Sequence, residues 1–223
     1  MIFLDIITNA NIKCVFIIAS SDFILCFLFG KKARWFQLHG LVNLLIVNII
    51  KNDVYNLITE PYCVYELKYR NDFEELYYIL YLHLYHMLFF KNTMMDYFHH
   101  VVFVLFGTIP IYYFYNMNLI KLATFAGCGL PGVFEYFTLT LVKHNIITSL
   151  NQKIFITNIY NYFRYPFSIF SISLIYYNHI IGITNNISNY TIFYTMLMIF
   201  YNGGYYNKLL IENKTWHMLS IKN

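Results

Sequence analysis

The sequence predicts an all-α protein, a polytopic bundle of transmembrane helices with about seven spans. Hydrophobic residues make up 59% of the 223 residues and charged residues only 12%, against about 25% charged in soluble domains. The mean hydropathy is +0.50, and apolar stretches near the roughly 20 residues needed to cross a bilayer recur along the chain. A soluble domain of this size could not bury so much apolar surface, so lipid must cover it.

Charge and cysteine content narrow the class further. The net charge of +4 comes from scattered lysines and arginines without a basic run, which argues against a nucleic-acid partner and leaves membrane lipids as the expected partners. The four cysteines show no CxxC or metal-ligand spacing, so we expect neither a disulfide framework nor a metal site from them. The first ten residues lack the basic stretch of a cleaved signal peptide, so the first span is expected to act as the targeting signal.

The first two candidate spans are Ile12–Gly30 and Trp35–Ile50. The first contains Asp22, which we expect to lie at the interface or to have a partner, because unpaired charges are costly in hydrocarbon. It ends at the basic residues 31–34, which mark a membrane edge. The second is short, but its tryptophan and the following Lys51 are interface anchors.

A polar loop and two further spans follow. Asn52–Phe73 is the only extended polar stretch in the sequence. The third candidate span, Leu76–Phe90, contains His83 and His86, which share a helix face because they are three residues apart. A tight turn then leads to the fourth, Tyr97–Tyr115.

The last three candidate spans are Leu119–Val142, Ile154–Tyr177 and Ile187–Tyr201, followed by a polar tail. Residues 127–132 interrupt the fifth span with glycine and proline, which membranes tolerate where neighbouring helices satisfy the freed backbone groups. The sixth contains Arg164, a charge that needs a partner or a polar cavity.

Basic residues in the predicted loops set the orientation, because cytosolic flanks are enriched in lysine and arginine. The flanks after odd-numbered spans contain nine basic residues: Lys31, Lys32, Arg34, Lys91, Lys143, Lys153, Lys208, Lys214 and Lys222. The opposite flanks contain five: Lys13, Lys51, Lys68, Arg70 and Lys121. This bias predicts a lumenal N-terminus and a cytosolic C-terminus. Asn186 and Asn189 begin glycosylation sequons that would face the lumen, but their loop lies close to the membrane.

Asp96-Tyr-Phe-His99-His100, directly before the apolar residues 101–106, is the candidate functional site. Titratable groups inside a membrane segment indicate function by default. Adjacent residues of a helix point about 100° apart, so we expect one imidazole to be the working group and the other its support. A general base that takes a proton from an amine or hydroxyl suits imidazole. The alternative is a pair of interface histidines that bind lipid headgroups or backbone carbonyls.

The sequence suggests two further arrangements of polar side chains. His83 and His86 could cluster with the histidine pair across a short turn, which would suggest a metal, but the remaining histidines are isolated and form no further ligand box. A hydrogen-bonded histidine face is the expected arrangement, without metal. Glu135 has no basic neighbour in sequence, and the expectation is that it pairs with Arg164 of the next span or lines a polar cavity.

The ordered set of motifs resembles the TLC domain, the family of ceramide synthases and TRAM-type translocon-associated proteins. The stretches that carry the resemblance are residues 35–42 with His39, the span with His83 and His86, residues 96–100, residues 129–132, and residues 158–166 with Arg164 and Pro166. The resemblance implies six helices around a cavity in residues 34–216. Residues 1–33 would then add an N-terminal transmembrane helix, and residues 217–223 a cytosolic tail.

The resemblance implies a lipid-handling protein of the endoplasmic reticulum or a related endomembrane, which binds or modifies an acyl or sphingoid lipid. An enzyme of this type would be an acyltransferase with His99 or His100 as base and coenzyme A thioester as donor, without a further cofactor. His39, His83, His86, Glu135 and Arg164 would bind substrate or line the cavity. Association into homo- or hetero-oligomers stays open.

One departure from the family bears on the reaction. Where ceramide synthases carry acidic residues after the histidine pair, this sequence has Gly-Cys-Gly-Leu at residues 127–130. Glu135 is the nearest acid, about two helical turns away, which argues against ceramide synthesis. The alternative function is a non-catalytic regulator or sensor of membrane lipid composition. A transporter is less favoured, because no inverted repeat is visible.

Overall fold

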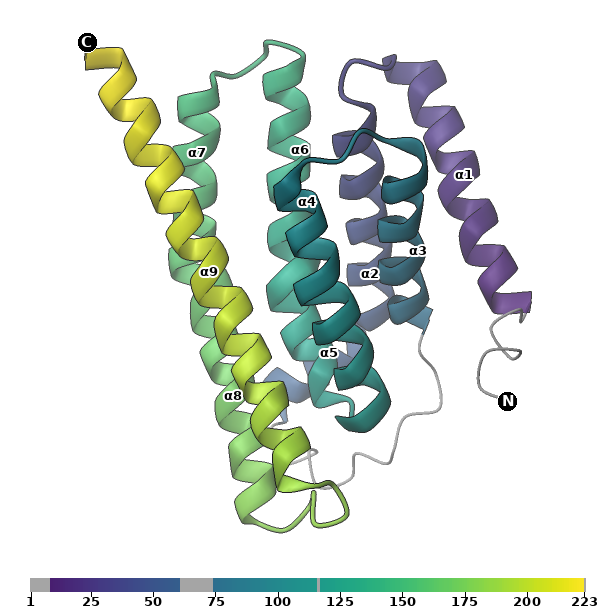
Figure 1. The fold of residues 1–223 in the computed structure, drawn as a ribbon, viewed down its shortest axis with the longest axis vertical. Coiled ribbons are helices and arrows are strands. Elements are labelled where there is room, and N and C mark those ends of the chain that lie inside the picture. The colour runs from purple at the N-terminus through teal and green to yellow at the C-terminus, as the bar shows by residue number, and fades with distance from the viewer. Residues whose placement is uncertain (1–8, 61–73, 116, 223) are drawn as a thin grey trace.

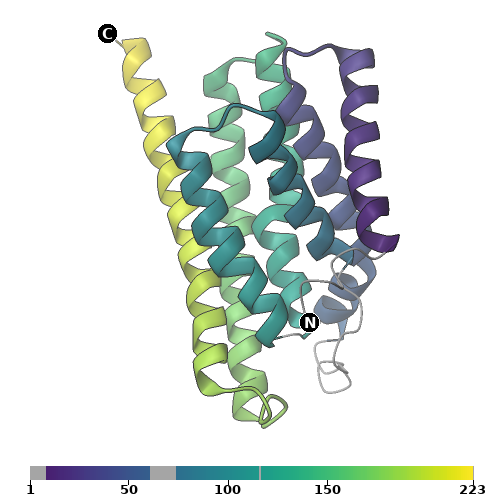
Figure 2. The ribbon, with the colours of Figure 1, turned by 45° about the vertical axis from the view of Figure 1, so that its right-hand side comes forward.

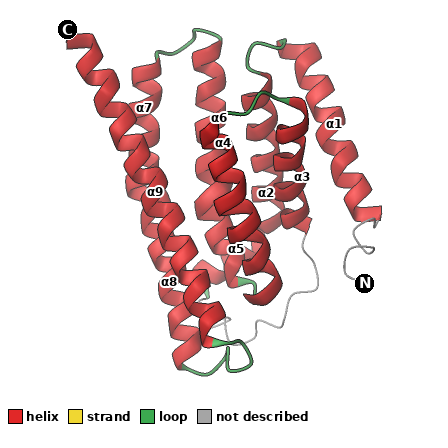
Figure 3. Ribbon diagram, in the orientation of Figure 1, coloured by secondary structure: helices red, strands yellow, loops and turns green. Residues whose placement is uncertain are grey.

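The computed structural model describes residues 9–60, 74–115 and 117–222. Within these residues the chain forms seven helical rods and no strand (Figures 1 and 3), as predicted. The first three rods are α1 (Asn9–Phe29), α2 (Arg34–Thr59) and α3 (Glu74–Phe89). The fourth rod consists of α4 (Met94–Phe98) and the π-helical segments η2 (His99–Thr108) and η3 (Ile111–Tyr115). The fifth consists of α5 (Leu119–Thr124), the π-helical η4 (Phe125–Gly129) and α6 (Leu130–Lys143). The sixth consists of α7 (Ser149–Ile159), the π-helical η5 (Tyr160–Arg164) and α8 (Tyr165–Ile180). The seventh is α9 (Asn189–Lys222).

The rods run alternately up and down (Figures 1 and 2). Residues 30–33, 90–93 and 144–148 connect rods at one end of the bundle, where α9 also ends; we call this the upper end, as it is drawn in Figure 1. The first turn of α1 and the turn before α9 lie at the opposite, lower end. The two ends of the described chain are therefore on opposite sides of the bundle.

Within the described residues, four helices are long and apolar enough to cross a membrane: Asn11–Phe29, Arg34–Thr59, Met94–Tyr115 and Leu119–Lys143. The outer surface of the bundle is also apolar. On α1, Phe16, Phe23 and Phe27 are 72%, 75% and 82% exposed. Soluble proteins rarely leave contiguous apolar patches of this kind uncovered, so lipid is their natural surrounding. The chain is a membrane protein built of helices.

The core of the bundle follows from an apolar stripe on α2. Leu38, Val42, Ile46, Ile50 and Val54 recur every four residues and are all buried. Residues four apart lie close together on a helix, and this stripe belongs to the main hydrophobic core, in which α2 contacts α1, α3, α5 and α6. α2 is thereby the central helix of the N-terminal half, and the polar side chains beside the stripe point into the same interior.

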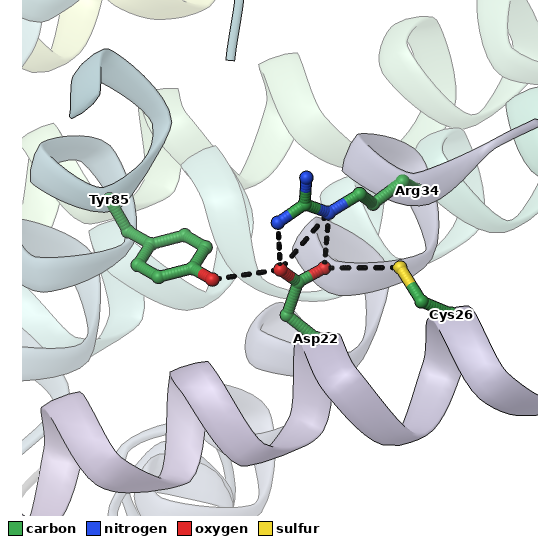
Figure 4. Close-up of polar contacts among 4 residues, drawn as sticks. All are labelled: Asp22, Cys26, Arg34 and Tyr85. Atoms are coloured by element: carbon green, nitrogen blue, oxygen red, sulfur yellow. Dashed lines mark hydrogen bonds and ion pairs between the residues drawn. The ribbon is translucent and has the colours of Figure 1, made fainter. Parts of the chain in front are cut away.

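A buried ion pair joins α1 to its neighbours (Figure 4). The Asp22 carboxylate of α1 accepts hydrogen bonds from the Arg34 guanidinium at the start of α2, with Nε of Arg34 2.9 Å from Oδ1. It also accepts one from the Tyr85 hydroxyl of α3 at 2.8 Å, and the Cys26 thiol lies 3.6 Å away. The prediction that Asp22 has a partner is therefore confirmed.

Two predicted boundaries were wrong. α2 continues to Thr59, so residues 52–59 of the predicted polar loop are helical, while residues 61–73 lie outside the described part. The cause is tertiary packing: Val54 is buried, and Asp53 forms an ion pair with Lys121 of α5. α9 likewise runs through the glycines at 203 and 204 and continues to Lys222, within the predicted tail. Its 34 residues span about 51 Å, more than the roughly 30 Å hydrocarbon layer, so its polar turns extend beyond the membrane.

Candidate functional site

A cavity of about 330 Å³ lies inside the bundle, and residues of all six rods from α2 to α9 line it. α1 contributes no lining residue. The volume falls within the range of small-molecule pockets, near its lower limit. The arrangement agrees with six helices around a cavity and one helix outside them.

The two ends of the cavity differ in chemistry. Its upper part is lined by polar side chains: His39, Asn43, His83, Asp96, His99, Glu135, Tyr136, Tyr160, Arg164, Asn202 and Tyr206. Its lower part is lined mainly by apolar ones, including Ile46, Ile79, Leu82, Phe103, Val104, Ile111, Ile120 and Ile199. Individual rods show the same division. From the upper to the lower end of the rod of α4, the lining changes from Asp96 and His99 to Ile111. From the lower to the upper end of α9, it changes from Ile199 to Tyr206. A site that is polar at one end and apolar along the rest matches an amphiphile with one chain.

His99 lies at the centre of a hydrogen-bonded chain of side chains in the polar part. Nδ1 of His83 is 2.6 Å from the carbonyl oxygen of Ile79, which only accepts, so this nitrogen carries the hydrogen. In a neutral imidazole Nε2 of His83 is then an acceptor, and it receives the N–H of Nε2 of His99 at 2.9 Å. Nδ1 of His99 is left as the basic atom, and it accepts the hydroxyl of Tyr206. The chain Tyr206–His99–His83 can therefore move a proton from the cavity to His99.

His100 and His86 form a second pair that does not line the cavity. Nδ1 of His86 is 3.1 Å from Nε2 of His100, and both side chains are buried. The ring of Trp35 stacks on His86 at 3.7 Å between centroids. Of the two candidate bases, only His99 faces the cavity. His100 and His86 belong to the packing behind it, so His86, which is predicted to bind substrate or line the cavity, does not line this cavity.

His39 enters the cavity from α2. Its ring stacks on Tyr136 of α6 at 3.7 Å and meets His83 edge-on at 5.8 Å. The ring is buried, and its Nδ1 has no hydrogen-bond partner among the described residues. The four predicted histidines of the α3 and α4 rods and His39 thus gather in one cluster at the upper end of the bundle.

Glu135 and Arg164 both line the cavity, but the direct ion pair that the sequence led us to expect is absent from the described residues. Tyr160 stands between them. Its hydroxyl donates to Oε2 of Glu135, and its ring lies 4.4 Å from the guanidinium carbon of Arg164. Nη2 of Arg164 donates to Asn202 at 2.9 Å. The arginine is held by π-faces and an amide in place of a carboxylate.

Sequence reasoning missed the polar residues that complete the site: Asn43, Tyr136, Tyr160, Asn202 and Tyr206. Asn43 follows His39 by four residues, and Tyr160 precedes Arg164 by four, so both share a helix face with a predicted site residue. That spacing is a signal that could have found them. The chain has 23 tyrosines, which hides the few that face inward.

Metal binding has no ligand set in the described part of the chain. No group of three histidine, cysteine, aspartate or glutamate side chains converges there in a way that could hold a metal ion. The histidines contact one another in pairs, through hydrogen bonds that use their nitrogen atoms. The arrangement as it stands supports proton transfer and hydrogen bonding.

Comparisons with known proteins assign no family to this geometry. The chain matches no protein-family model, no curated protein and no solved structure.

Proposed function

We propose that the chain is a TLC-type lipid-handling protein of the endoplasmic reticulum or a related endomembrane, which binds a single-chain acyl or sphingoid lipid in the cavity. The observation that carries the proposal is the division of the cavity into a polar upper part and an apolar lower part. The lining of the rod of α4 extends from Met95 to Tyr112, up to about 25 Å along the helix, which suits an extended hydrocarbon chain. Met95 is also half exposed, so the polar part reaches the surface of the molecule.

The polar part supports acyl transfer with His99 as general base. A lipid amine or hydroxyl would attack the carbonyl carbon of a coenzyme A thioester, forming the new C–N or C–O bond as the C–S bond breaks. Its proton would pass through the hydroxyl of Tyr206 to Nδ1 of His99 and from there to the leaving thiolate. With a cytosolic C-terminus, the polar part would face the cytosol, where a water-soluble thioester is available.

The adjacent histidines provide a matched pair for the test. We expect purified full-length protein to retain a single-chain lipid that mass spectrometry detects. We expect membranes that contain it to transfer labelled acyl groups from thioester to long-chain amines or alcohols. His99→Gln should lower that transfer at least about 100-fold, the usual scale of general-base catalysis, while lipid remains bound. His100→Gln, which alters a residue outside the cavity, should keep most of the transfer.

Two other results would count against catalysis or against lipid binding. Bound lipid with equal acyl transfer in wild type and both variants would exclude catalysis and leave regulation or sensing of lipid composition as the function. Protein that binds no single-chain lipid at all would contradict the proposal.

A further inference from the structure

Arg164 is a buried cation without a counter-ion in the described part of the chain. It lies in η5, lines the cavity and is 6% exposed. Its Nη2 donates a hydrogen bond to Asn202, while Nε is buried without an acceptor among the described residues. No described carboxylate lies within 4.0 Å of it. Charges inside a membrane bundle are normally paired, because an uncompensated one is costly.

The groups around the guanidinium leave its charge unneutralised. The rings of Tyr160 and Tyr206 lie 4.4 and 4.8 Å from its carbon, and such contacts stabilise a cation without cancelling its charge. The nearest acid on the cavity wall, Glu135, accepts the hydroxyl of Tyr160. The phenol therefore separates carboxylate from guanidinium. An anion that enters the cavity is the remaining partner.

Other side chains in the polar part also lack partners. Nδ2 of Asn43 and Nδ1 of His39 are buried without hydrogen bonds among the described residues, and both side chains line the cavity. An amide N–H can only donate, so Asn43 requires an acceptor. Nδ2 of Asn43 packs against Gly132 of α6, so the guanidinium of Arg164 is the donor that a head group rich in oxygen acceptors would meet.

We propose that the cavity selects a long-chain carboxylate, a free fatty acid, with Arg164 as its counter-ion. This rests on the lipid binding of the proposed function and not on its acyl transfer, because a carboxylate has no amine or hydroxyl that could accept an acyl group. Guanidinium and carboxylate form charge-assisted, bidentate hydrogen bonds. Asp96 and Glu135 also line the polar part, so a dianionic phosphate head would meet two carboxylates and one unpaired cation. The single negative charge of a carboxylate fits this balance better, and the volume of about 330 Å³ favours one chain over two.

The test compares head groups on one chain length. Purified full-length protein in detergent is incubated at mildly alkaline pH with labelled palmitate or labelled hexadecanol, and each is competed with lysophosphatidate. We expect palmitate to bind at least about tenfold more tightly than hexadecanol, as charge-assisted hydrogen bonds predict. Arg164→Gln should remove that preference while hexadecanol still binds, and Arg164→Lys should keep part of it. Lys208→Gln is the control, because it removes an exposed positive charge outside the cavity.

Several results would overturn the inference. Equal affinity of wild-type protein for palmitate and hexadecanol would do so without any variant, even if Arg164→Gln fails to fold. Tighter binding of lysophosphatidate than of palmitate would exclude the monocarboxylate. In both cases bound hexadecanol would leave the proposed lipid binding intact. Failure of every single-chain amphiphile to bind would overturn the inference and the proposed function together.

Discussion

Asn43 and Gly132 show how closely the polar part of the cavity is packed. A Cβ atom added at residue 132 would lie 2.3 Å from Nδ2 of Asn43 and 3.2 Å from its Cγ, closer than side chains approach one another. Asn43 belongs to α2 and Gly132 to α6, so the contact sets the separation of two helices that both line the cavity. Glycine is required here by the close approach of α2.

Gly132→Ala is therefore expected to destabilise the protein by about 1–3 kcal/mol, the usual cost of overpacking. It should also lower the amount of lipid that copurifies, because the amide of Asn43 would have to move. Thermal unfolding in detergent, followed by intrinsic fluorescence, measures the first effect. Gly204→Ala is the control: nothing lies within 4 Å of an added Cβ, and alanine in a helix should be neutral or stabilising by up to about 1 kcal/mol. Equal shifts in the two variants would contradict this account.

The histidine pair shows what the sequence could predict of the site. Adjacent residues diverge on a helix, which predicts that one imidazole works and the other supports it. Which one faces the cavity depends on the rods around them. The hydroxyl of Tyr206 in α9 donates to Nδ1 of His99, whereas His100 contacts His86, on which Trp35 stacks. Neither contact is visible in the sequence, because both partners are distant along the chain.

At the level of elements, proline explains three of the four described π-helical segments that line the cavity. Pro110, Pro131 and Pro166 each follow one of them, η2, η4 and η5. Proline has no N–H and its ring clashes with the carbonyl four residues earlier, so the α-helical register cannot continue through it. In each case the residue before the proline donates its N–H five residues back, Ile109 to Val104, Leu130 to Phe125 and Tyr165 to Tyr160. The prolines predict a distortion in these spans. Whether the helix breaks there or continues through a wider π-helical turn depends on the packing of the neighbouring rods.

The contact between α1 and the rest of the bundle depends on one buried ion pair. α1 lines no part of the cavity and contacts α2 and α3. At its centre lies the ion pair of Asp22 and Arg34, whose side chains are 5% and 32% exposed (Figure 4). Removing one partner of a buried pair leaves an uncompensated charge, whereas removing both is far less costly.

A double-mutant cycle measures this contact. We expect Arg34→Gln to lower the stability by about 3–5 kcal/mol, because it strands the buried Asp22 carboxylate, and Asp22→Asn to cost less, since Arg34 can reach solvent. The double variant should recover part of the loss, which gives a coupling energy above about 1 kcal/mol. The pair of Lys208 and Glu212, 76% and 55% exposed, serves as the control and should couple by about 0.3–0.5 kcal/mol. Equal coupling in both cycles would show that the Asp22 pair does not hold α1 in place.

At the scale of the whole molecule, the number of rods followed from the sequence and their lengths did not. Seven apolar stretches separated by polar or basic turns predict seven helices, because each stretch must satisfy its own backbone hydrogen bonds in lipid. The ends of α2 and α9 lie in polar sequence, where hydropathy carries no signal. The ion pair of Asp53 with Lys121 stabilises the last turns of α2, and the exposed pair of Lys208 and Glu212 supports the C-terminal part of α9.

The distribution of basic residues between the two ends predicts the orientation of the bundle in the membrane. Lys121 on the lower side is paired with Asp53, and Arg34 on the upper side is paired with Asp22, so each flank has one neutralised cation and the excess on the upper side is unchanged. With Asn186 and Asn189 replaced by glutamine, a glycosylation tag on a flexible spacer should be modified at the N-terminus and unmodified at the C-terminus. A gel shift that endoglycosidase reverses reads out each case. Glutamate in place of Lys31 and Lys32 should weaken the preference, because it removes positive charge from the first upper loop. Modification of the C-terminal tag in the otherwise unchanged chain would reverse the orientation and place the polar part of the cavity in the lumen, away from a cytosolic acyl donor.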